Sequence, residues 1–346
     1  MLRWNPIRSL WSAPVAALAL LAGPAAVPAL AGPAPGQAVP SPTLRSVLLD
    51  WSFDPLVAVP LLAAATLYLL GRRRIVERGQ RWPAQRTACF LGGLGTIALA
   101  LQSPIERYDT ALFSVHAGQH LLLAMIAAPL LALGAPITMV LMTASAPARK
   151  RIVRVVHSLP VRIIGYPLIA WILFTMTLYA LYFSPLFDLS LRNQYVHDAI
   201  HLHFIAVGLL FWWPVVGLDP TRWRLHHLAR VLYVFLMVPF HAFLGVAIMN
   251  SGHLLAPSLA TFVRGWGPTP LADQQAGGAI MWGAGDIISL VAVIAILASW
   301  ASYEEKVAVR EDRRIARERA ARQARAEAAQ ASEVAGAVRA DEAEGS

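Results

Sequence analysis

Two pairs of histidines in this chain have a spacing that places them on one face of a helix. His116 and His120 stand at the head of one apolar run, and His197 and His201 stand at the head of another. Residues four positions apart are neighbours on a helix surface, so each pair predicts two adjacent imidazoles. Imidazole is a ligand for copper, zinc, iron and nickel. A polar side chain inside a membrane helix is costly and marks a candidate functional site.

The composition is that of a membrane protein rather than a soluble one. Of the 346 residues, 57% are hydrophobic and only 14% are charged, whereas a soluble domain carries about 25% charged residues. We therefore expect several membrane spans. The single cysteine, Cys89, excludes an internal disulfide framework and any paired-cysteine metal motif. The net charge of +9 comes from loops between apolar runs, so no nucleic-acid partner is expected.

The chain divides into four predicted segments. Residues 1–31 combine early arginines, an apolar run and small residues, which predicts a signal peptide or, if it stays uncleaved, an additional N-terminal helix. Residues 32–52 are rich in Pro, Gly and Ser and predict an external linker. Residues 53–302 are expected to form an all-α membrane domain, and residues 303–346 form a basic tail rich in Ala, Arg and Glu.

The membrane domain contains seven apolar runs, each near the ~20 residues that a bilayer requires. We place these spans at about 55–71, 87–102, 114–142, 164–183, 197–217, 230–249 and 279–300. Proline lies inside or at the ends of several of them, which membrane bundles tolerate because neighbouring helices satisfy the freed backbone groups.

The distribution of basic residues predicts the orientation of the spans. The turns after the first, third and fifth spans, together with the tail, hold 23 Lys and Arg residues, while the other side of the mature chain holds only four. Basic loops stay in the cytoplasm. We therefore expect the N-terminus outside, the C-terminus in the cytoplasm and the chain in the inner, or plasma, membrane of a cell.

This topology brings polar residues of four spans to a similar depth below the outer surface. His241 lies about 12 Å below the outer end of the sixth span and Asp286 about 10 Å below that of the seventh, at about 1.5 Å per residue. The predicted metal ligands are His116, His120, His197, His201, His241 and Asp286. Secondary candidates are His203, His253, Met281 and Asp273. One ion does not need so many imidazoles, so some would orient others or form a second site.

Several readings of this cluster remain open at the level of the residues. Each histidine alone could be an interhelical hydrogen-bonding residue, but a buried cluster without a ligand must satisfy every member. Haem is a rival to copper, since two histidines on facing helices can ligate it, whereas the absence of a CxxCH motif excludes covalent c-type haem. A copper transporter is a further alternative. Asp198 is a candidate for orienting a neighbouring imidazole.

Four stretches carry a resemblance to a known family. They are FSVHAGQHLLL with APLLALG in residues 113–134, HDAIHLHF with FWWP in 197–214, PFHAFLG in 239–245, and DQQAGGAIMW in 273–282. These stretches resemble the multi-span type of the bacterial CtaG family of cytochrome c oxidase assembly proteins.

The resemblance implies a non-enzymatic role in forming active cytochrome c oxidase through copper supply. Its implied partners are oxidase subunits, periplasmic copper chaperones and the lipid bilayer. This chain departs from the family at one point: members often read His-Met-x-Gln-His in the third span, whereas this chain reads His116-Ala-Gly-Gln-His120. A methionine ligand at that point is therefore absent. Asp273 is open to two interpretations, as a ligand or as the cap of its own helix, and Gly277 and Gly278 indicate close helix packing.

Overall fold

The chain is all-α in the computed structural model, which describes residues 36–220 and 223–344. Within those residues there is no strand, and the only β-type contact is an isolated bridge between Ala38 and Val263. Contacts divide the chain into two compact units, which meet at Val291 and Ala292. The predicted signal segment, residues 1–31, lies outside the described residues.

The long apolar helices agree with the predicted spans. Along the chain they are α3 (Pro55–Glu77), α4 (Ala84–Gln102), α6 (Phe113–Leu121) continued by η1 (Leu122–Ala127), α7 (Ala128–Leu133) and α8 (Pro136–Thr143), then α11 (Pro167–Tyr182), α13 (Gln194–Val216), α14 (His227–Phe235) with α15 (Met237–Met249), and α16 (Pro270–Glu344). In the described part of the chain, six continuous segments are long and apolar enough to cross a membrane. A seventh candidate is α11 together with α12 (Leu186–Arg192), which are bent by 68°. The predicted multi-span all-α class is confirmed.

The third span contains a π-helical turn, η1, directly after the His116–His120 pair. In this turn the N–H of Ala128 donates to the carbonyl of Leu123 five residues earlier, and Pro129 has no backbone N–H to donate to the next carbonyl, that of Ala124. Nε1 of Trp212 in α13 donates to that carbonyl instead, at 3.0 Å. A methyl group at Gly208 would lie 2.9 Å from the same oxygen, so only a glycine lets α13 approach this closely. The π turn therefore ties the third span to the fifth.

Helices α15 and α16 also meet through glycines, which agrees with the close packing predicted for Gly277 and Gly278. A methyl group at Gly245 would lie 2.6 Å from the carbonyl oxygen of Gly278, and one at Gly278 would lie 2.8 Å from that of Gly245. Gly277 faces the ring of Phe113 at the start of α6 with no room for a side chain. Small residues at such crossings let backbones pack closely in a membrane.

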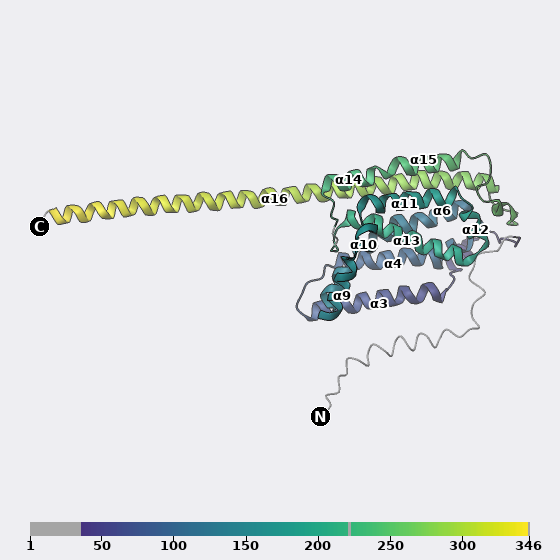
Figure 1. Ribbon diagram of the computed structural model, residues 1–346, viewed down its shortest axis with the longest axis horizontal. Helices are drawn as coiled ribbons and strands as arrows, with labels where there is room; N and C mark the ends of the chain where they lie inside the picture. Colours follow the sequence, from purple (N-terminus) through teal and green to yellow (C-terminus); the bar gives the residue numbers. More distant parts are fainter. Residues whose placement is uncertain (1–35, 221–222, 345–346) are drawn as a thin grey trace, which may run out of the picture. The chain divides into compact units, whose positions relative to one another are not determined.

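Different short helices lie at the two ends of the bundle (Figure 1). The short helices α9 (Ala146–Val156) and α10 (Leu159–Ile164) lie at one end and carry Arg149, Arg151 and Arg162. We call this the basic end. Helix α12 lies at the opposite end (Figure 1), where α5 (Pro104–Tyr108) and η2 (Pro257–Thr261) connect neighbouring spans.

Part of the predicted linker packs against the connecting segments. Val39 is buried with Tyr108 and Phe262, and its backbone N–H donates to the carbonyl of Val263 at 2.9 Å. Nε1 of Trp266 donates to the Val39 carbonyl at 2.8 Å. A short helix, α2 (Leu44–Leu49), follows with a Thr43 cap.

The second unit, from Ala292 onward, is the continuation of α16. The described side chains from 301 to 325 are all exposed, and ion pairs on the helix surface join Arg314 to Glu311 and Glu318. Spacings of three and four residues place these charges beside one another. The tail that the sequence marks as charged is thus helical through Glu344.

Candidate metal centre

The two histidine pairs face each other between α6 and α13. Ring centroids are 4.1 Å apart for His116 and His120 and 4.4 Å apart for His197 and His201. Across the helices, His116 lies 5.7 Å from His197, and His120 lies 5.7 Å from His201. All four side chains are buried. The predicted spacing therefore produces a closed quadrilateral of imidazoles, the histidine cluster.

Two carboxylates that sequence reasoning missed border the histidine cluster. Asp109 follows α5, and its Oδ2 lies 2.8 Å from Nε2 of His197 and 3.8 Å from Nε2 of His201. Glu106 in α5 has Oε2 3.9 Å from Nδ1 of His201. Both carboxylates are buried, Asp109 completely. The carboxylate that binds His197 is thus Asp109, whereas neighbouring Asp198 is exposed and accepts a hydrogen bond from Gln194.

Gln119 connects the acidic side chains to the histidines. Its amide nitrogen donates to Oε2 of Glu106 at 2.7 Å and to the carbonyl of Ala100 at 3.0 Å. Its amide oxygen lies 3.0 Å from Nε2 of His201, which places a proton on that ring nitrogen. Gln119 sits between the two histidines of α6 in sequence, and its side chain is fully buried. Its side chain fixes the orientation of Glu106 and His201.

Four of these residues meet the distance requirement for a shared ion. Ligand atoms of Glu106, Asp109, His197 and His201 all lie within 4.8 Å of one another. We call this group the carboxylate–histidine site. It offers two oxygen and two nitrogen donors and no sulfur, a set that suits divalent ions of the first transition row.

Several buried polar atoms around this site have no hydrogen-bond partner among the described residues. They are both ring nitrogens of His116, Nε2 of His120, Nδ1 of His197 and Oδ1 of Asp109. Buried polar groups are nearly always satisfied in folded proteins. Several unpartnered atoms in one group of neighbouring side chains are typical of a ligand site, and imidazole nitrogen and carboxylate oxygen are metal ligands. The residues present fit a bound metal ion.

Aromatic side chains close the histidine cluster on its other sides. The hydroxyl of Tyr182 lies 3.2 Å from Nδ1 of His120, and the ring of Phe204 stacks on His120 with centroids 4.1 Å apart. Phe187 in α12 lies 4.9 Å from His116. The bend between α11 and α12 places Tyr182 and Phe187 on the same side of the cluster. These rings exclude water and hold the imidazoles in place.

The other predicted ligands lie elsewhere. His241 is buried in α15, where its ring is parallel to Phe174 at 6.3 Å and its Nδ1 faces Gly285 of α16. Asp286 is half-buried beside that glycine, with Oδ1 unpartnered among the described residues. His203 is exposed and pairs with Thr177 at 2.9 Å, and His253 is exposed in the loop after α15.

Asp273 has a third role that neither interpretation of the sequence included. Its Oδ2 accepts a hydrogen bond from the backbone N–H of Phe113 and its Oδ1 accepts one from the hydroxyl of Ser114, both at 2.6 Å. These groups begin α6, so Asp273 caps the helix that carries His116 and His120. Its neighbour Gln274 binds the backbone of Leu255 and His253, and Met281 is buried.

The residues that sequence reasoning missed left a weak local signal. Glu106 and Asp109 are three positions apart in the stretch PIERYD, directly before the third span. Their spacing matches one helical face, but charged residues between spans are ordinarily solvated. Tyr182 belongs to another span, and no spacing in the sequence pairs it with His120.

Comparison with known proteins identifies the family of this chain. Uncharacterized proteins of Mycobacterium leprae (strain TN) and Mycobacterium tuberculosis (strain CDC 1551 / Oshkosh) are each 34% identical to this chain over 283 residues, covering 79% of the chain and 42% of the relative. The chain thus spans less than half the length of these relatives. No solved structure matches it significantly. The family described as cytochrome c oxidase caa3 assembly factor matches residues 66–302, which include the histidine cluster. The chain is a multi-pass membrane protein of the cytochrome c oxidase caa3 assembly factor family.

Proposed function

We propose that this protein binds a copper ion at the carboxylate–histidine site and supplies it during cytochrome c oxidase assembly. The observation that carries the proposal is the convergence of Glu106, Asp109, His197 and His201 within 4.8 Å. Copper as the metal comes from the family's role in oxidase assembly. Oxidase subunits are the proposed recipient, and periplasmic copper chaperones are a proposed donor.

The donor set favours a single small ion over haem. Neighbouring imidazole rings in the histidine cluster are 4.1 to 5.7 Å apart, and Phe204 and Phe187 pack against them. The gap between facing histidines is therefore too small to hold a haem macrocycle. Carboxylate oxygens favour a divalent ion over Cu(I), which prefers thiolate and thioether sulfur. We therefore assign Cu(II) as the bound form.

Delivery of the ion would need ligand exchange and no covalent chemistry. His116 and His120 adjoin the site, and their rings carry buried nitrogens without a partner among the described residues. An ion leaving His197 and His201 could pass to these imidazoles before it reaches a recipient protein. Such a role agrees with an assembly factor that is not an enzyme. The histidine cluster would then face the outer side of the membrane, as the arginine distribution predicts.

Copper stoichiometry and electron paramagnetic resonance of the purified full chain test this function. We expect one Cu(II) per chain with nitrogen hyperfine splitting, and loss of that signal in His201→Ala and Asp109→Asn. His203→Ala is the matched control, because His203 is on the same helix but exposed and paired with Thr177. Unchanged copper content in His201→Ala and Asp109→Asn would overturn the site, and a Soret band in the purified protein would favour haem.

A further inference from the structure

A second site lies at the basic end of the bundle, and none of the residues that form or border the histidine cluster lines it. It is a pocket of about 440 Å³ between the start of α11, the segment before α14 and α14 itself. Its lining residues are Tyr166, Pro167, Leu168, Trp171, Trp223, Arg224, Leu225, Tyr233 and Leu236. Ligand pockets in proteins measure about 300–1,000 Å³, so the volume suits part of a small amphiphile.

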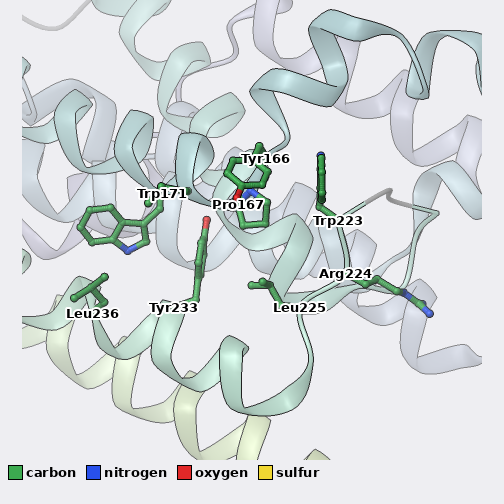
Figure 2. A pocket seen from close by; sticks show the side chains of 9 residues that line it. Tyr166, Pro167, Trp171, Trp223, Arg224, Leu225, Tyr233 and Leu236 are labelled. Atoms are coloured by element: carbon green, nitrogen blue, oxygen red, sulfur yellow. The ribbon is translucent and has the colours of Figure 1, made fainter.

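Two polar atoms in the wall of this pocket lack partners among the described residues. Nε1 of Trp171 and the hydroxyl of Tyr233 are both buried without a hydrogen bond, and the Trp171 side chain is only 7% exposed. Figure 2 shows both side chains in the wall of the pocket, with the Tyr233 hydroxyl directed toward Pro167. Both groups can donate, so the wall is suited to acceptor oxygens in an otherwise apolar space.

The rim of the pocket is positively charged. Arg224 extends away from the two rings (Figure 2), and its Nε donates to the carbonyl of Gly217 at 3.1 Å. The guanidinium of Arg162 lies 5.9 Å from the ring centroid of Trp223, whose Nε1 donates to the Arg162 carbonyl at 3.1 Å. None of the described residues that line the pocket is acidic. The rim therefore suits an anionic group.

We infer that this pocket binds an anionic phospholipid. Its phosphate would lie at the rim near Arg162 and Arg224, its ester oxygens would accept hydrogen bonds from Trp171 and Tyr233, and one acyl chain would contact Leu236. Tryptophan and tyrosine are enriched where a membrane protein meets the headgroups. Basic pockets between membrane helices bind anionic headgroups on the cytoplasmic side, which is where the arginine distribution places this end. This site does not depend on the copper proposal.

Native mass spectrometry of the purified full chain tests the proposal with two lipids of identical acyl chains. Phosphatidylglycerol is expected to remain bound as a one-to-one adduct under collision energies that remove phosphatidylcholine. Arg162→Gln should weaken phosphatidylglycerol binding about five-fold, the effect of one cation near a charged surface. The double variant Trp171→Phe/Tyr233→Phe should weaken the binding of both lipids, because their ester groups are the same.

Arg149→Gln is the matched control, since Arg149 is exposed at the same end but lines a different hollow. Equal retention of the two lipids by the unaltered chain would overturn the proposal. An equal loss of phosphatidylglycerol binding in Arg149→Gln and Arg162→Gln would also overturn it, because it would indicate a general attraction of the lipid to the basic end rather than binding in this pocket. Displacement of phosphatidylglycerol by a short-chain quinone would assign the pocket to that ligand instead. If the double variant does not give a monodisperse protein, the single variant Tyr233→Phe tests the contact with the ester groups and Arg162→Gln tests the contact with the phosphate.

Discussion

Oδ2 of Asp109 lies 2.8 Å from Nε2 of His197, and both side chains are buried between α5 and α13. The pair joins a short connecting helix to the fifth span through residues 88 positions apart. Asp109 also reaches to within 3.8 Å of His201, so His197 and His201 share this carboxylate. Its second oxygen has no partner among the described residues. This arrangement makes Asp109 the most informative position to alter.

Asp109→Asn should lower copper affinity by more than the about 10–100-fold seen when a group that only contacts a metal-binding histidine is lost, because Asp109 is itself a proposed ligand. The amide keeps the shape of the side chain but removes the charge that a divalent ion requires. Isothermal titration with Cu(II) under a competing chelator measures the change. Asp198→Asn is the control, because Asp198 is exposed on the same helix as His197. An equal loss of affinity in both variants would contradict a specific role for Asp109.

Gln119→Leu should lower the free energy of unfolding by about 1–3 kcal/mol, because Glu106, His201 and the Ala100 carbonyl would each lose a buried partner. Thermal denaturation in detergent measures the effect. The exposed pair Gln194–Asp198 offers a matched comparison, and Gln194→Leu should cost about 0.5 kcal/mol or less. Similar melting temperatures for the two variants would show that the buried network contributes little.

Asp273→Ala should destabilise the protein by about 0.5–2 kcal/mol and weaken copper binding, because the start of α6 loses its cap. Asp273→Asn keeps a side-chain oxygen that can accept the Phe113 N–H, so it should restore most of both properties. Melting temperature and copper affinity are measured on the same preparations. If Asp273 were a metal ligand, both variants would lose copper equally while stability stayed constant.

Gly278→Ala should destabilise the bundle by about 1–3 kcal/mol, since the methyl group would lie 2.8 Å from the Gly245 carbonyl. Gly283 lies on the same helix, and a methyl group added there would meet no packed neighbour within 4 Å. Gly283→Ala should therefore be neutral or stabilise by up to about 1 kcal/mol, the difference in helix propensity. Thermal denaturation of the two variants side by side checks the prediction. Equal melting temperatures would exclude a close contact between α15 and α16.

The sequence by itself determined the class of the fold. Apolar runs of near-constant length require helices that cross a bilayer, because backbone groups in lipid must be satisfied within the segment. The four-residue spacing of His116 with His120 and of His197 with His201 likewise determined that each pair shares a face. Which residues share a face of one helix depends only on their spacing in the sequence, so no tertiary contact is needed to predict it.

Only the tertiary structure decided which faces meet. It brings Asp109 and Glu106 from a connecting segment to His197 and His201, and it places Asp273 against the start of α6 rather than near a metal. It also sets His241 beside Phe174 and Gly285. Residues tens of positions apart meet through helix rotation, the α11–α12 bend and close glycine crossings. These depend on packing between spans, because the bilayer distinguishes apolar from polar faces but not one apolar helix from another.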